Sequence, residues 1–129
     1  MPPWCEKYDI ERDEWYTTAD LPFGVRNPSA CALTADTVYL FGGKSQQGME
    51  MKFSDKILLY IISSNLWLTL PIKMPKCALT VPIKINDYQI ALFGGLAYIQ
   101  GPNGEQTVGP SMQVLLFDVR LPSITYAPK

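Results

Sequence analysis

Histidine is absent from the sequence, which removes the commonest general base and the commonest metal ligand in proteins. The three cysteines, Cys5, Cys31 and Cys77, are odd in number and widely spaced. That pattern fits neither a disulfide framework nor a zinc site. We therefore expect no catalytic residues, no metal site and no cofactor in this chain.

Long hydrophobic runs are also lacking, since the longest is the short stretch from Ile57 to Ile62. The N-terminal residues have no basic start followed by an apolar segment, so we expect neither a secretory signal nor a membrane partner. Lysines and arginines are scattered and the net charge is −1, which argues against nucleic acid. With the unpaired cysteines, these features favour a cytoplasmic protein.

What the sequence does contain is enough apolar material for one packed domain. Its 129 residues are 47% hydrophobic and 18% charged, which is typical of a globular chain rather than a disordered one. Within it, a single spacing of 52 residues relates three pairs of landmarks. The pairs are Gly42-Gly43 with Gly94-Gly95, Tyr8 with Tyr60, and Trp15 with Trp67. A recurring spacing of this size indicates a structural repeat.

Each repeat predicts four β-strands and no helix. Apolar stretches rich in β-branched and aromatic residues alternate with turn-forming residues, which is the pattern of hairpins. Three hairpins are expected, over residues 29–43, 77–95 and 55–70, with turns near Ala35-Asp36, Asn86-Asp87 and Ser63-Asn65.

One short match disagrees with this spacing. The letters CALT occur from Cys31 to Thr34 and again from Cys77 to Thr80, only 46 residues apart. Either the second unit has a first hairpin that is longer by about six residues, or the match is chance. We favour a longer hairpin or loop.

Four strands per unit of about 50 residues, with a glycine pair after the second strand, resemble the kelch repeat of β-propellers. The residues that carry the resemblance are Gly42, Gly43, Tyr60 and Trp67 in one unit, Gly94, Gly95 and Phe117 in the next, and Tyr8 and Trp15 before them. Ile124 stands seven residues after Phe117, where the other units have tryptophan. The last strand is therefore degenerate or differently registered.

The resemblance implies an all-β fold, a partial kelch-type propeller of four-stranded antiparallel blades. Residues 1–20 would form the outer strands of an incomplete blade, residues 21–69 one blade, and residues 70–129 a second blade with a degenerate last strand. Propellers close with four to eight blades, so two and a half cannot close a ring. Further blades are expected as partners, in cis or in trans.

Binding residues are expected where the loops between second and third strands meet the loops between blades. Both sets emerge at the same end of a propeller, and here the former are the long segments 44–56 and 96–112. Arg26 also matches a position where kelch repeats often carry arginine, whereas the next unit has Ala78 there. The candidates are Arg26, Lys44, Gln46, Gln47, Lys76, Tyr98, Gln100 and Asn103.

By resemblance, the function is that of a non-catalytic protein-interaction module. It would serve as substrate receptor or scaffold of a larger protein, such as a ubiquitin-ligase adaptor, and its partner is a protein. Two alternatives stay open. The chain could be a structural subunit of a cytoskeletal or axonemal assembly, or part of a kelch-type oxidase or sugar isomerase whose active site lies in other blades.

Overall fold

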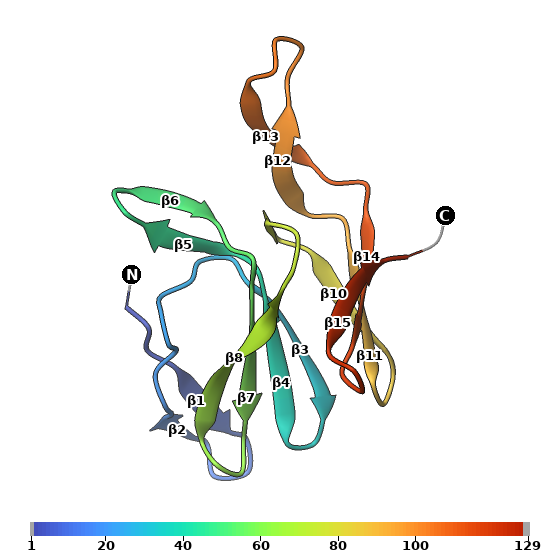
Figure 1. Cartoon of the computed structure of the whole chain (residues 1–129). Helices are drawn as coiled ribbons and strands as arrows, with labels where there is room; N and C mark the ends of the chain where they lie inside the picture. The colour runs from blue at the N-terminus through green and yellow to red at the C-terminus, as the bar shows by residue number, and fades with distance from the viewer. Residues whose placement is uncertain (1, 128–129) are drawn as a thin grey trace.

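The structure is a computed structural model and describes residues 2–127. Over that range the chain is all-β, with strands β1 to β15 and no helix, and so none that could cross a membrane. The sheets are small, antiparallel and not closed into a ring (Figure 1). This confirms the predicted partial β-propeller.

Two four-stranded sheets form the body of the molecule, and we call them blade I and blade II. Blade I has the order β3 (Ser29–Thr34), β4 (Thr37–Phe41), β7 (Lys56–Ile61), β8 (Leu66–Lys73). Blade II has the order β10 (Val81–Asn86), β11 (Gln89–Phe93), β14 (Val114–Asp118), β15 (Ser123–Tyr126). A separate hairpin of β1 (Glu6–Asp9) and β2 (Glu14–Thr17) precedes them.

The first hairpins of the two blades have the same length and the same register. Ser29 pairs with Phe41 in blade I, and Val81 pairs with Phe93 in blade II, 52 residues later. Both hairpins also carry a register shift at the same place, before the turn. The expectation of a longer hairpin in the second unit is therefore wrong. Cys77 lies outside this hairpin, in the short strand β9, so the CALT match is coincidental.

In each unit, an aromatic residue lies directly opposite the residue seven positions later on the adjacent strand. Tyr8 lies opposite Trp15 with ring centroids 5.1 Å apart, and Tyr60 lies opposite Trp67 at 4.8 Å. Phe117 lies opposite Ile124 in the same way. The last strand thus keeps the register although isoleucine replaces tryptophan, because backbone pairing sets the register and the side chain only adds cross-strand packing.

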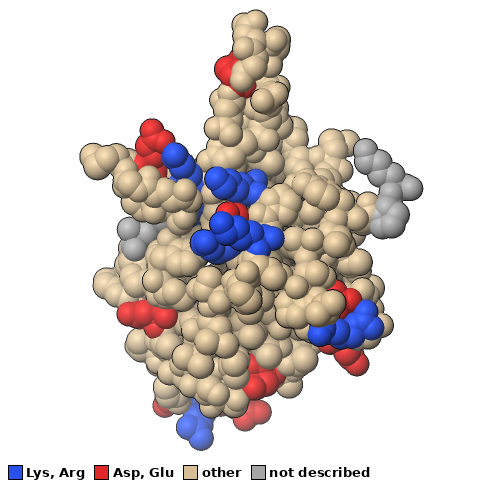
Figure 2. Space-filling view, viewed as in Figure 1, with Lys and Arg blue, Asp and Glu red and all other residues tan. Residues whose placement is uncertain are grey.

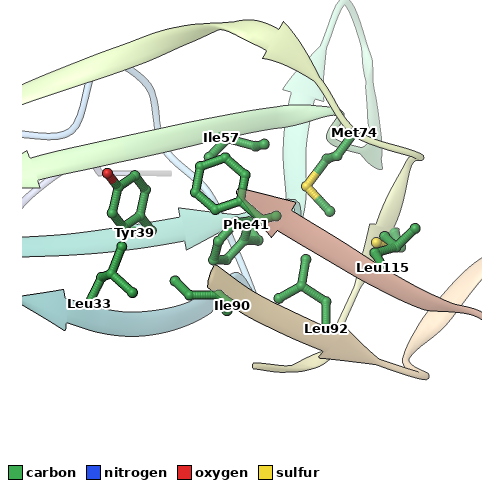
Figure 3. Close-up of a cluster of buried hydrophobic side chains, with 10 residues drawn as sticks. Leu33, Tyr39, Phe41, Ile57, Met74, Ile90, Leu92 and Leu115 are labelled. Carbon is green, nitrogen blue, oxygen red and sulfur yellow. The ribbon is translucent and has the colours of Figure 1, made fainter. Parts of the chain in front are cut away.

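The hydrophobic core lies between the two blades. Phe117 of β14 is fully buried, and its ring lies 5.2 Å from that of Tyr39 and 5.3 Å from that of Phe41, both on β4. Figure 3 shows Tyr39 and Phe41 facing Ile90 and Leu92 of β11. Burial of such side chains contributes roughly 1.5–3 kcal/mol each. The contact between blades is therefore the main source of stability.

The glycine pairs mark where neighbouring backbone comes closest. Gly42 and Gly95 both have positive φ, at 61° and 87°. A Cβ on Gly95 would lie 2.5 Å from the carbonyl oxygen of Ala78, and one on Gly42 would collide with that of Cys77. No side chain fits at either site, so only glycine allows the backbone segments to approach this closely.

Candidate functional site

Two hairpins project from one end of the molecule, while the tight turns of the blades lie at the other (Figure 1). The first joins β5 (Lys44–Gln47) to β6 (Glu50–Phe53), and the second joins β12 (Leu96–Gln100) to β13 (Gln106–Pro110). The segments expected as long loops are therefore themselves β-hairpins. Glycines with positive φ at the tips, Gly48 and Gly104, allow the tight reversals that hairpins need.

Each hairpin is anchored by the segment that enters its blade. Arg26 and Lys44 exchange two backbone hydrogen bonds of 2.7 Å, and Ala78 of β9 (Cys77–Ala78) lies opposite Leu96 in the same way. Arg26 and Ala78 are therefore equivalent positions. The backbone of Arg26 is structural, and its side chain remains exposed at this end of the molecule.

The two hairpins also contact each other at their bases. The backbone N–H of Phe53 donates to the Tyr98 hydroxyl at 2.9 Å, and the two rings lie 4.7 Å apart. The Lys44 ammonium lies 5.4 Å from the centre of the Phe53 ring, a cation–π distance. These contacts join the bases of the two hairpins.

A hollow of about 380 Å³ lies at the base of the β5–β6 hairpin. Its walls come from the segment before Arg26, from the hairpin and the residues that follow β6, and from the segment that leads from blade I into blade II. The lining residues are Phe23, Gly24, Ser45, Gln46, Gln47, Ser54, Asp55, Lys56 and Lys76. A volume of this size is within the range of ligand pockets.

Three of the residues expected to bind, Gln46, Gln47 and Lys76, meet in this hollow. Lys44 lies beside the hollow because it is adjacent to Ser45, which lines it. Arg26 lies there too, because its backbone pairs with that of Lys44. Tyr98 lies at the junction of the hairpins. Gln100 and Asn103 are carried away on the second hairpin, where the Asn103 N–H donates to the Glu105 carboxylate at 2.9 Å.

The other lining residues were not among those expected to bind. Of these, Phe23 supplies an aromatic ring, Asp55 a carboxylate and Lys56 an ammonium group. In the sequence, Lys56 directly precedes an apolar stretch, which indicates only the beginning of a strand. The Asp55 carboxylate lies 3.7 Å from the Lys56 ammonium, which partly neutralises that pair. No sequence signal pointed to the pairing of Lys56 with Lys73, because it lies beyond a register shift that the strand pattern does not show.

The buried thiol at this end does not behave as a nucleophile. Cys77 is buried at the contact between the blades, and burial raises its pKa to about 11. The group therefore stays a neutral thiol near pH 7. Burial also raises the pKa of the Tyr39 hydroxyl, which lies in the core. The side-chain amides and ammonium groups that line the hollow are suited to recognising a ligand.

No protein-family model matches the chain. It is 35% identical over 92 residues to "Kelch-like protein 38" of Rattus norvegicus, and 35% and 33% identical to the proteins of that name from Mus musculus and Homo sapiens. The match covers 70% of this chain and 15% of each relative. Together with the repeated glycine pairs and aromatic pairs, this similarity places the chain in the kelch-repeat family.

Proposed function

We propose that the chain is a non-catalytic protein-interaction module that works as part of a larger kelch propeller. One observation carries the proposal. The face of blade I that bears Phe41 is covered by blade II, whereas the equivalent face of blade II is uncovered. We call the latter the open face, and it bears Val81, Ile83 and Phe93.

The open face has the composition of a packing surface. Val81 is 58% exposed, Ile83 is 50% exposed and Phe93 is 40% exposed. They lie on one side of the sheet, because Val81 pairs directly with Phe93 and Ile83 is two residues along the same strand. A contiguous apolar surface of this kind favours burial against a partner. The equivalent face of blade I is covered by blade II. We therefore propose that a further blade, from the same chain or from another, covers the open face.

Light scattering behind size exclusion tests this assignment. We expect the chain to form a defined oligomer or a complex with added kelch blades, and we expect Ile83→Glu to prevent it. Leu121→Glu is the matched control, because Leu121 is also a large apolar residue, is more exposed than Ile83 (82% against 50%) and lies in the β14–β15 turn. A compact, cooperatively unfolding monomer that is indifferent to Ile83→Glu would overturn the assignment.

We further propose that the end with the projecting hairpins recognises a protein, in the manner of a substrate receptor such as a ubiquitin-ligase adaptor. Two hairpins joined at their bases, beside a hollow, support this, because recognition surfaces are commonly built on loops that a rigid scaffold positions. A photo-crosslinker at Gln47 should capture the partner, and one at Leu121 should not. Recovery of ubiquitin-ligase subunits supports the adaptor role, and recovery of actin or tubulin instead would replace it with a cytoskeletal one.

The setting we propose for this work is the cytoplasm. Three cysteines that are free in the structure support it, since secreted domains of this size commonly use their cysteines in disulfides. Fractionation of cells with an antibody against the chain checks this point, and recovery of the protein from the medium would contradict it.

A further inference from the structure

Positive charge gathers around the hollow although the chain as a whole has a net charge of −1. Figure 2 shows lysine and arginine side chains clustered at the base of the projecting hairpins, with acid among them. The segments 23–28, 44–56 and 73–76 carry six of the 11 basic residues and only two acidic ones, Glu50 and Asp55. The six are Arg26, Lys44, Lys52, Lys56, Lys73 and Lys76.

Both acids of these segments are already engaged. Glu50 lies 3.7 Å from Lys52, and Asp55 lies 3.7 Å from Lys56. Within residues 2–127, no carboxylate is close enough to form an ion pair with Arg26, Lys73 or Lys76. Lys76 lines the hollow, and Lys73 lies opposite Lys56 on the adjacent strand. The hollow thus has uncompensated positive charge at its rim.

The remaining walls are suited to a peptide rather than a bare ion. The Gln47 side-chain amide makes only long contacts of 3.5 Å, to the Ser45 hydroxyl and the Phe53 carbonyl, so it can turn to a ligand at little cost. Gln46 is exposed beside it. Amides both donate and accept, which matches a peptide backbone, and Phe23 supplies an apolar surface.

We infer that the hollow binds an acidic segment of a partner protein, with its carboxylates held by Lys76, Lys73 and Lys56. This inference rests on the proposed interaction function and adds the chemistry of the ligand. Lysine binds a carboxylate as a point charge, so the site selects a ligand by its negative charge and not by one fixed geometry of its carboxylates. The attraction between exposed charges weakens as salt screens it. Binding of the acidic segment therefore falls with ionic strength.

Fluorescence anisotropy with labelled hexaglutamate tests the inference on the whole 129-residue chain, with hexaserine and hexalysine as comparison probes. We expect hexaglutamate to bind best, and Lys76→Glu or Lys73→Glu to weaken it by about tenfold, because each replaces attraction by repulsion. Lys7→Glu makes the same change of charge on β1, at the other end of the molecule, and should weaken binding by less than about twofold.

The outcomes of this experiment distinguish a failure of the inference from a failure of the proposed interaction function. Equal weakening by Lys7→Glu and Lys76→Glu overturns the inference, since the attraction would then be general. Preferential binding of hexaserine also overturns it, but leaves a peptide-binding module in place. Displacement of hexaglutamate by low inorganic phosphate would show a site for small anions and overturn the assignment to protein. No binding of any peptide, with a Gln47 crosslinker capturing nothing, would count against the proposed receptor role itself.

Discussion

Phe41 and Phe93 hold equivalent places in blades I and II, 52 residues apart, and their surroundings differ. Phe41 is 1% exposed and packs edge-on against Phe117, whereas Phe93 is 40% exposed. The strands beneath them have the same pairing and the same register. The two blades therefore differ in what covers them and not in how they fold.

The glycine pairs give the same contrast at the level of the backbone. The Gly43 N–H donates to the Cys77 carbonyl at 2.9 Å, so the segment that enters blade II lies directly on the end of β4. At the equivalent end of β11, the nearest atom to a Cβ on Gly94 is the Ser111 carbonyl oxygen at 3.7 Å. A repeat protein stabilises each unit through its neighbour, so the uncovered end is expected to be the weaker one.

The largest effect is expected from Phe117→Ala. Removing a fully buried aromatic ring between the blades should lower the free energy of unfolding by about 3–5 kcal/mol. Phe93→Ala is its matched control and should cost about 1 kcal/mol, because Phe93 is already 40% exposed and gives up less buried area. Urea denaturation followed by tryptophan fluorescence measures both. Equal losses would mean that the open face is already covered in solution.

A smaller effect is expected from Gly42→Ala. The added methyl group meets the Cys77 carbonyl and also forces a positive φ, so the free energy of unfolding should fall by about 3 kcal/mol. Gly94→Ala imposes the positive φ without the collision and should cost about 1 kcal/mol. The same urea titration compares them. If a further blade binds the open face, the cost at Gly94 should rise toward that at Gly42.

Thiol labelling offers a finer measure of the same contact. Cys77 is buried where the blades meet, while Cys31 on β3 is partly exposed. A variant that keeps only Cys77 should react with a maleimide at least about tenfold more slowly than one that keeps only Cys31, because the reagent needs an opening motion. Both should react alike in denaturant. Equal rates in the native state would mean that the blades separate easily.

Much of this fold could be predicted from the sequence, because the 52-residue spacing is set by strand pairing. Gly42, Gly94 and the Tyr60–Trp67 pair gave the strand order and the number of blades. At Ile124 the last strand is degenerate in its side chain and keeps its register, which decides between the two alternatives. The CALT match misled, because the first hairpins of both blades have the same length and register. Identical letters can fall on non-equivalent strands, as those that begin at Cys31 and Cys77 do.

The site was less predictable. The hollow gathers Phe23, Gln46 and Lys76 from three segments that the sequence keeps far apart. Which of the end-facing residues share a cavity depends on how the hairpins lie, and their bases are joined by the Phe53 N–H contact with Tyr98. A contact between residues 45 positions apart leaves no periodic trace. The sequence therefore predicted that the two long segments lie at one end of the molecule, but it did not indicate the cavity.

The smallest effect is expected at the far end, where the blades tie their turns differently. In blade I the Asp36 carboxylate accepts bonds from the Ser63 N–H and hydroxyl, at 2.7 and 2.8 Å. In blade II the Asp118 carboxylate accepts two from the Arg120 guanidinium, at 3.2 and 2.7 Å, and one from the Gln89 amide. The side-chain hydrogen bonds of Arg120 lower the pKa of Asp118 from 3.8 to about 2.

A lowered folded-state pKa means that Asp118 stabilises the fold above its unfolded pKa of 3.8 and loses this contribution as the pH falls toward 2. Arg120→Met should therefore flatten the loss of stability between those two values, and thermal unfolding at a series of pH values measures it. Arg12→Met is the control, because Arg12 makes only a long 4.0 Å contact with Asp9. The effect should be small, since the pair is exposed to solvent. An unchanged slope in Arg120→Met would mean that the pair of Asp118 with Arg120 does not stabilise the turn of blade II, in contrast with the sign expected from its lowered pKa.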